Sequence, residues 1–253
     1  MKQINKYIVE RLHINKDTGN RHYNYHPKTR VELKELVNKL IKERGNDADL
    51  NDIDTSEITD MSYVFYKSKF NGDISNWDVS NVEDIGYMFY DSKFTGENGD
   101  ISNWDISNVK DMEAMFFMSL FNGDISDWNV SNVESMNSMF YDSKFTGENG
   151  DISKWDVSNV KDMKGMFAKS NFNGNISEWD VSNVKYMEYM FNDSKFTGDI
   201  SNWDVSNVYN MHYMFSESKF NGNISNWNVS NVYDMRHMFD KSPLEKNPPK
   251  WYK

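Results

Sequence analysis

The chain has 253 residues, contains no Cys and carries a formal net charge of -11. The lack of thiols excludes a disulfide scaffold, a thiolate zinc site and a cysteine nucleophile, and 15% aromatic residues are too many for a disordered tail. No run of about eighteen apolar residues occurs, so the sequence predicts no membrane span.

The first 49 residues are predicted to form an N-terminal cap. Thr29 and Glu32 have the spacing of a capping box, and Gly45 suits a helix end. We therefore expect an amphipathic helix over about residues 30–44 that covers the open edge of the first repeat. Its apolar stripe consists of Leu33, Leu36, Val37, Leu40 and Ile41.

The rest of the N-terminal region has weaker signals. Residues 7–9 and 12–14 could be short strands, and four nearby acidic residues look like the polar edge of the cap rather than a calcium loop. The N-terminus lacks the apolar core and cleavage site of a secretory signal, so the chain as given is expected in the cytoplasm, or at the cell surface if it is a mature fragment. The four acidic residues are Asp47, Asp49, Asp52 and Asp54.

Tryptophan marks a repeat through the remainder of the chain. Successive Trp residues are 24 residues apart, except for two gaps of 27 in which three extra residues enlarge a Gly-containing loop. A fixed period of this size is typical of a solenoid, in which each unit stacks on the next. The register contains Trp77, Trp104, Trp128, Trp155, Trp179, Trp203, Trp227 and Trp251.

Other residue types keep fixed positions within each unit. Fourteen of the sixteen Met and fifteen of the sixteen Phe occupy recurring slots, which indicates a stacked core. The spacing Ile-x-x-Trp-x-Val, as in residues 74–79, matches a leucine-rich repeat strand, and Asn81 is expected to satisfy backbone groups where the strand bends. Residues 82–89 show a helical spacing of apolar positions. We therefore predict an α/β solenoid, a right-handed coil with a parallel β-sheet on the concave side and short helices outside.

The units divide the chain into three regions. The solenoid is expected over residues 50–242, with a degenerate first coil at 50–73 in which Ile53 takes the Trp slot. Residues 243–253 are expected to be a C-terminal cap, because the adjacent Pro248 and Pro249 cannot donate ladder hydrogen bonds.

The unit itself has a recognisable form. Residues 70–89 read Phe-Asn-Gly-Asp-Ile-Ser-Asn-Trp-Asp-Val-Ser-Asn-Val and then Ile-x-x-Met-Phe, where most later units have Met-x-x-Met-Phe. This pattern closely resembles the BspA-like bacterial leucine-rich repeat family, which includes the repeats of mycoplasma-type surface lipoproteins. The resemblance covers residues 50–253. It implies a leucine-rich-repeat solenoid, often displayed on a cell surface for adhesion or protein binding, and it supplies no catalytic residues.

Charge favours a protein as the partner. Residues 1–45 hold eleven Lys or Arg against five Asp or Glu, a net +6, whereas the remainder holds seventeen against thirty-four, a net -17. An acidic body repels phosphate and anionic lipid, which disfavours direct nucleic-acid binding and favours a protein with a basic patch. The sequence leaves the oligomeric state open.

Two surfaces are candidates for that partner. Strand Asp residues should stack on the concave face about 4.8 Å apart, either as a hydrated ladder or as a binding row. On the outer side the C-terminal units gather Tyr, His and Arg, residue types that include interface hot spots, although the tyrosines could simply cover the coils. The concave row contains Asp78, Asp105, Asp156, Asp180 and Asp204. The outer set contains Tyr186, Tyr189, Tyr209, Tyr213, Tyr233, His212, Arg236 and His237.

The polar positions form ladders of like groups, whereas catalysis needs unlike groups that converge. We therefore expect no catalytic residues, no metal site and no cofactor. The predicted function is a non-enzymatic protein-binding module that acts through a rigid acidic and aromatic surface. Two alternatives are a cell-surface adhesin whose export signal was removed, and a phage- or mobile-element-encoded inhibitor that blocks a host defence or nucleic-acid enzyme by acidic mimicry.

Overall fold

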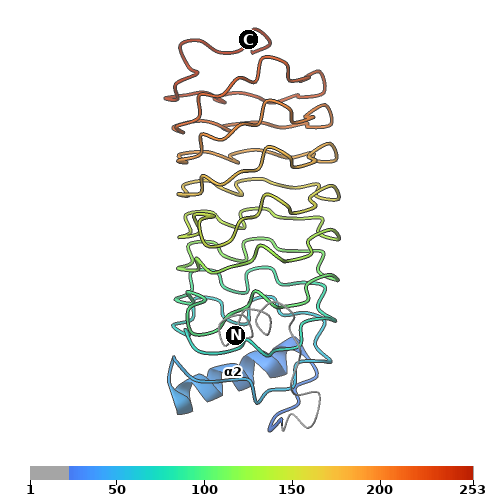
Figure 1. Ribbon diagram of the computed structural model, residues 1–253, viewed down its shortest axis with the longest axis vertical. Coiled ribbons are helices and arrows are strands. Elements are labelled where there is room, and N and C mark those ends of the chain that lie inside the picture. The colour runs from blue at the N-terminus through green and yellow to red at the C-terminus, as the bar shows by residue number, and fades with distance from the viewer. Residues whose placement is uncertain (1–22, 253) are drawn as a thin grey trace, which may run out of the picture.

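The computed structural model describes residues 23–252, which wind into coils stacked along one long axis (Figure 1). The helix α2 (Arg30–Arg44) lies at the N-terminal end of the stack, and the C-terminus lies at the opposite end. The strands predicted at residues 7–9 and 12–14 fall outside the described part of the chain.

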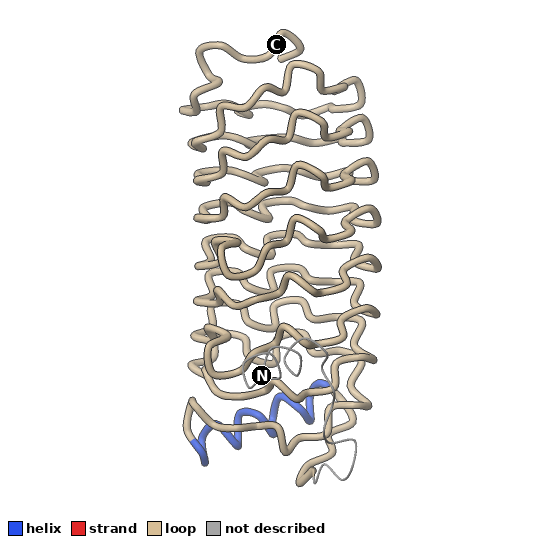
Figure 2. The backbone as a smooth tube through the Cα atoms, viewed as in Figure 1, coloured by secondary structure: helices blue, strands red, loops and turns tan. Residues whose placement is uncertain are grey.

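The predicted α/β solenoid with a parallel sheet and outer helices is wrong. Within residues 23–252, α2 is the one helix and no β-strand forms (Figure 2). Neighbouring coils are joined instead by isolated parallel bridges, in which a residue pairs with its counterpart one repeat later, as in Asp60 with Asp84 and Asp84 with Asp111. The coils stack as the repeat predicts, but the backbone within each coil is built from turns.

Left-handed residues prevent the outer helices. Tyr63 and Lys67 have φ values of 61° and 55°, and their counterparts Tyr87 and Asp91 have 58° and 48°. An α-helix needs every φ near -60°, so two left-handed residues four positions apart in each coil interrupt it. The apolar residues still point inward at the predicted spacing, because overlapping turns bring the same side chains to the core.

The outer segment of the first coil, residues 61–67, makes two kinds of backbone hydrogen bond, and the same holds for its counterparts in later coils. The amide of Met61 donates to the carbonyl of Asp84 at 2.8 Å, and the amide of Tyr63 donates to that of Gly86 at 3.1 Å, both in the next coil. The amide of Val64 donates instead to Met61, three residues back, at 3.4 Å. This division links coil to coil without a regular strand or helix.

Asx turns replace the expected concave strands. The Asp78 carboxylate accepts a hydrogen bond of 3.0 Å from the Ser80 amide, and the Trp77 amide donates to the carbonyl of Ile74 at 3.1 Å. These local bonds use groups that a strand would offer to its neighbours. The predicted alternation of buried Trp77, exposed Asp78 and buried Val79 is nevertheless present.

The predicted stack of core residues is confirmed. The indoles from Trp77 to Trp227 are at most 5% exposed, and the Met and Phe slots are closed to solvent in nearly every coil. Phenylalanine rings stack from coil to coil, as in Phe65 on Phe89, whose centroids are 5.4 Å apart. Every indole Nε1 donates to a main-chain carbonyl of the preceding coil, from Trp77 on Leu50 at 3.0 Å to Trp251 on Ile224 at 2.9 Å.

The predicted asparagine ladder is confirmed as well. The Asn81 side-chain amide donates to the carbonyl of Ser56 in the preceding coil at 2.8 Å. The same bond recurs in each later unit, up to Asn231 on Ser206 at 2.7 Å. Each of these amides therefore satisfies a carbonyl at a bend of the neighbouring coil.

The helix α2 forms where the sequence predicts it. The Thr29 side chain accepts from the Glu32 amide at 3.3 Å, and the Gly45 amide closes the C-terminal end on the carbonyl of Ile41 at 2.9 Å. The apolar stripe faces the stack: Leu33, Val37 and Leu40 are fully buried and belong to the core. At the far end Trp251 stacks on Trp227 at 6.4 Å. The domain limits 1–49, 50–242 and 243–253 stay predictions.

Candidate functional site

The predicted outer residues lie on three neighbouring coils near the C-terminal end, and we call them the C-terminal outer patch. The structure brings four of them into one aromatic cluster. The Tyr213 ring stacks on Tyr189 at 5.2 Å and on His237 at 4.9 Å, and His212 meets the edge of Tyr213 at 4.2 Å. The patch contains Tyr186, Tyr189, Tyr209, His212, Tyr213, Tyr233, Arg236 and His237.

The side chain of Arg236 is held in place but open to solvent. Its Nε and Nη2 donate to the two carboxylate oxygens of Asp234 at 2.9 and 2.7 Å. This pairing holds the pKa of the Asp234 carboxyl well below its usual range. The Arg236 side chain is 75% exposed, so one edge of an oriented guanidinium remains available to a partner.

The remaining tyrosines of the patch make fewer contacts within the chain. Tyr186 meets Tyr209 edge-on at 6.5 Å. Tyr209 is 39% exposed, and Tyr233 is 73% exposed. Their backbones are nevertheless fixed, because the Tyr233 amide donates to the carbonyl of Tyr209 at 2.9 Å. These rings are therefore displayed on an ordered backbone.

The sequence analysis did not predict one buried carboxylate next to the patch, that of Glu188. Glu188 is 7% exposed, and one of its oxygens accepts from the Asn210 side chain at 2.9 Å and lies 3.7 Å from the Lys164 ammonium. The other oxygen has no hydrogen-bond partner. Burial raises the pKa of the Glu188 carboxyl. Nothing in the repeat pattern marks this position, because its slot varies from unit to unit.

The predicted concave Asp residues form an exposed column, but this column lies on turns and not on a sheet. Each carboxylate accepts a hydrogen bond from the amide of the Ser two residues later, at 3.0 to 3.1 Å. Their first role is therefore to hold the Asx turn. This column, which we call the Asp row, contains Asp78, Asp105, Asp156, Asp180 and Asp204.

A second aromatic column on the outer side was missed. Its rings occupy the position after the first Phe of their units, which the sequence analysis did not consider. Tyr66 stacks on Tyr90 at 4.9 Å, Tyr90 on Phe117 at 4.5 Å, and Phe117 on Tyr141 at 4.5 Å. Aligning the residue after the first Phe of each unit would have revealed it.

The acidic residues near the cap pair with nearby cationic or polar groups. Arg44 makes two hydrogen bonds of 2.9 Å to the Asp52 carboxylate, and His26 lies 3.1 Å from Asp54. Over residues 23–252, no three His, Asp or Glu side chains are arranged to hold a metal ion. Within the same residues no helix has the length and apolarity to cross a membrane.

The comparisons with known proteins identify a family but no characterised relative. A family model described as "Mycoplasma protein of unknown function, DUF285" matches twice, over residues 32–149 and 142–251. Searches of curated proteins and of solved structures found no match. The two family matches together cover most of the chain and confirm the resemblance to mycoplasma-type repeats. The chain therefore belongs to the family of Mycoplasma proteins of unknown function, DUF285.

Proposed function

We propose that this chain is a non-enzymatic protein-binding module whose partner docks on the C-terminal outer patch. The observation that carries the proposal is the exposure of four tyrosines on three neighbouring coils: Tyr186, Tyr189 and Tyr209 are 37 to 39% exposed, and Tyr233 is 73% exposed. Tyr and Arg are among the residue types that dominate binding energy at protein interfaces.

The stack supports this role by fixing the patch before binding. The Tyr189 amide donates to the carbonyl of His212 at 3.0 Å, and the Tyr213 amide donates to that of Arg236 at 3.2 Å. Ring stacking between Tyr189 and Tyr213 further restricts the two side chains. A surface that is ordered in the free protein loses less conformational entropy on binding.

The charge of the chain supports a basic partner. The net charge of -17 over residues 46–253 attracts cationic surfaces and speeds their encounter. The Asp row contributes to this field. It is the weaker candidate for the contact itself, because an oxygen of every carboxylate already accepts a turn hydrogen bond.

The resemblance of the units to BspA-like repeats points the same way, because that family is associated with adhesion and protein binding. A cell-surface adhesin and an intracellular inhibitor would differ in the identity of the partner. Both would need an exposed and ordered surface of the kind that the patch offers.

Site-specific photocrosslinking tests the proposal. A photoreactive phenylalanine analogue replaces Tyr233 in one variant and Glu134 in a matched control, because Glu134 occupies the same slot of an earlier coil. Both variants are irradiated in lysates and membrane extracts of candidate host cells. We expect one protein to crosslink at position 233 and not at 134. The purified protein should then bind the unmodified chain and lose affinity for Tyr189→Ala and Tyr213→Ala.

Equal crosslinking at both positions would contradict the proposal, and so would unchanged affinity of the tyrosine variants for the purified partner. Turnover of a substrate that depends on His212 or His237 would contradict the non-enzymatic part.

A further inference from the structure

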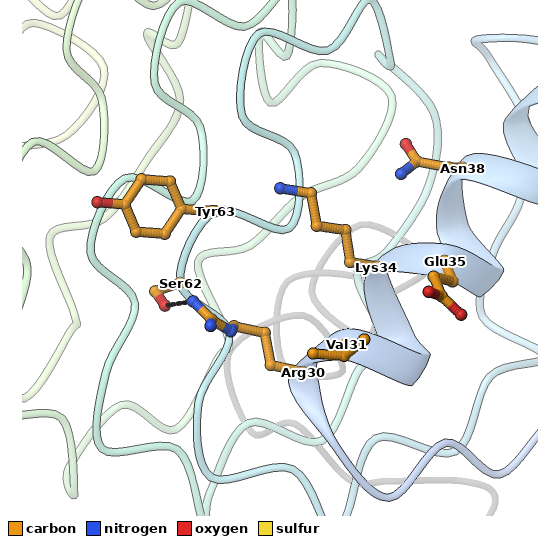
Figure 3. Close-up of a pocket in the computed structure, with 7 residues that line it drawn as sticks. All are labelled: Arg30, Val31, Lys34, Glu35, Asn38, Ser62 and Tyr63. Carbon is orange, nitrogen blue, oxygen red and sulfur yellow. Dashed lines mark hydrogen bonds between the residues drawn. The ribbon is translucent and has the colours of Figure 1, made fainter.

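A cavity of about 390 Å³ lies between α2 and the first coil (Figure 3). Its walls include Arg30, Lys34 and Asn38 from the helix and Ser62 and Tyr63 from the coil. Figure 3 shows the side chains of Lys34 and Arg30 extending from the helix toward Tyr63 and Ser62. A volume of this size is typical of sites for small organic ligands, which span about 300 to 1,000 Å³.

The aromatic wall of this cavity is the first ring of a stacked pair. One face of Tyr63 stacks on Tyr87, with ring centroids 4.6 Å apart and planes within 4° of parallel. Toward the N-terminal end no further ring of residues 23–252 stacks on Tyr63, and the Lys34 ammonium lies over this ring, 6.0 Å from its centroid. The cavity therefore lies on the side of Tyr63 where a preceding coil would have placed another ring.

The polar wall carries a positive charge that lacks a carboxylate partner. Arg30 donates to the Ser62 hydroxyl at 2.9 Å and lies 3.4 Å from the Asp60 carboxylate. Lys34 makes no ion pair with any of the described residues. Partial burial and the neighbouring charge of Arg30 lower the pKa of the Lys34 ammonium. A bound anion would relieve this unfavourable environment.

The one carboxylate in the cavity wall does not oppose such an anion directly. Glu35 follows Lys34 on α2, and in Figure 3 its carboxylate points away from both Lys34 and Tyr63. The Asn38 amide, one helical turn beyond Lys34, lies on the same side as the ammonium in this view. Asn38 therefore adds a neutral donor to the cavity wall.

We infer that this cavity binds a planar aromatic carboxylate, which stacks on the face of Tyr63 that the Lys34 ammonium overlies and places its carboxylate on that ammonium, with Asn38 and Arg30 in the cavity wall. A ring of this kind extends the Tyr63–Tyr87 stack by one member, and the carboxylate supplies the partner that Lys34 lacks. Aromatic rings stack favourably in offset geometry, and charge-assisted hydrogen bonds are the stronger ones. The same chemistry occurs in free aromatic acids and in a peptide that ends in an aromatic residue.

Calorimetry and amide NMR on the full chain test the inference with benzoate as the probe. Acetate carries the charge without the ring, and benzyl alcohol carries the ring without the charge. We expect benzoate to bind and to shift the amide signals of Lys34 and Tyr63, and we expect the other two probes to bind at least about tenfold more weakly. Comparing benzoate with acetyl-Gly-Phe, as free acid and as amide, then distinguishes a free acid from a peptide C-terminus as the natural source.

Matched variants complete the test. Lys34→Met and Tyr63→Ala should each weaken benzoate binding at least about tenfold, whereas Lys39→Met, on an exposed part of α2 outside the cavity wall, should not. Ala is tolerated at the left-handed Tyr63 position, because Ala114 occupies the same slot with φ 51°. The inference is overturned if benzoate does not bind, if acetate binds equally well, or if folded Lys34→Met and Tyr63→Ala retain full affinity. Tyr233→Ala should leave benzoate binding unchanged, which separates this site from the C-terminal outer patch.

Discussion

The indole Nε1 of Trp128 donates a hydrogen bond of 3.0 Å to the carbonyl of Ile101, one coil earlier. The indole is 3% exposed and Ile101 is 1% exposed, so this bond satisfies polar groups inside the core. Because all eight tryptophans make the equivalent bond, the repeat carries one buried side-chain connection per coil in addition to its apolar contacts. Trp in this slot therefore does more than fill space.

Replacing Trp128 by Phe should destabilise the protein. Phe keeps much of the apolar contact but removes one of the two donors to the Ile101 carbonyl, which then accepts only from the Trp104 amide at 3.2 Å. Losing one such hydrogen bond costs about 0.5 to 1.5 kcal/mol. Urea unfolding followed by circular dichroism gives the change in the free energy of unfolding. Trp251→Phe is the matched control, because this indole makes the same bond but is only partly buried, and its cost should be smaller. Equal costs at both positions would show that burial does not increase the contribution of this bond.

The Asp row should tolerate Asn but not Ala. Asp156 accepts from the Ser158 amide at 3.1 Å, and Asn129 makes the equivalent bond to Ser131 at 3.2 Å in another coil. Asp156→Asn should therefore keep the turn and leave thermal stability nearly unchanged, whereas Asp156→Ala should cost about 0.5 to 1.5 kcal/mol. A stability loss in the Asn variant that matches the Ala variant would mean that charge, and not the turn, matters here.

Asn substitutions in the Asp row also test whether its charges contribute to partner binding, because they remove the charges and keep the turns. A triple Asn variant of Asp156, Asp180 and Asp204 removes three charges and keeps three turns. We expect it to reduce the association rate of a basic partner about tenfold or less and to make that rate less dependent on salt, because these charges act at long range. The measurement is surface plasmon resonance at low and high salt with the crosslinked partner.

The C-terminal outer patch should control dissociation. Ala substitutions at Tyr189, Tyr213 and Tyr233 remove rings that would lie in the interface, and losses of about 2 kcal/mol or more are expected at interface hot spots. Such a loss should appear mainly as faster dissociation in the same surface plasmon resonance experiment. If the triple Ala variant releases the partner at the original rate, the partner contacts another part of the stack.

At the left-handed positions, a β-branched side chain should lower the free energy of unfolding more than an unbranched one. Met118 has φ 53° and is 44% exposed, so its side chain is not needed for the core. A β-branched Val is strained in this region, whereas Asn adopts it readily. Met118→Val should therefore be less stable than Met118→Asn by about 1 kcal/mol or more. Equal stability of the two variants in urea would argue against the turn geometry described for the outer segment.

The partly buried carboxyl of Asp111 should make stability depend on pH. Burial raises the pKa of Asp111, and the nearby charges of Glu113 and Asp162 add to the effect. A carboxyl with a raised pKa binds its proton more tightly in the folded state, so its contribution to stability falls as pH rises from the unfolded pKa through the folded one.

Asp111→Asn should consequently be more stable than the unmodified chain at pH 7, and this advantage should shrink as the pH is lowered toward 4. Asn is compatible with the slot, because Asn210 occupies it and accepts the equivalent turn bond from the His212 amide at 3.0 Å. Thermal unfolding at several pH values measures the difference. An advantage that stays constant with pH would show that the charge of Asp111 is not involved.

The periodic spacing of residues in the sequence predicted which side chains are buried and how the coils stack. It placed every Trp in one column, predicted that Asn81 and its counterparts satisfy backbone groups at the bend of each unit, and gave α2 its bounds from Thr29 and Gly45. These features follow from residue identity at fixed spacing, since a repeated unit with one apolar side can bury that side only against its neighbours.

The backbone conformation was decided by the tertiary structure. The spacing of Val82, Ile85 and Met88 fits a helix, but the same side chains reach the core through turns whose amides bond to the next coil. Tyr87 and Asp91 enter the left-handed region because the adjacent coil accepts their amides, at 2.7 Å on Glu113 and 2.6 Å on Phe117. The sequence by itself determined which residues lie inside and how the coils stack. The hydrogen bonds between coils join residues far apart in the sequence, such as Tyr87 and Glu113, which are 26 positions apart. These bonds determined that neither strands nor outer helices form in residues 23–252, because local patterns do not record where a distant carbonyl will lie.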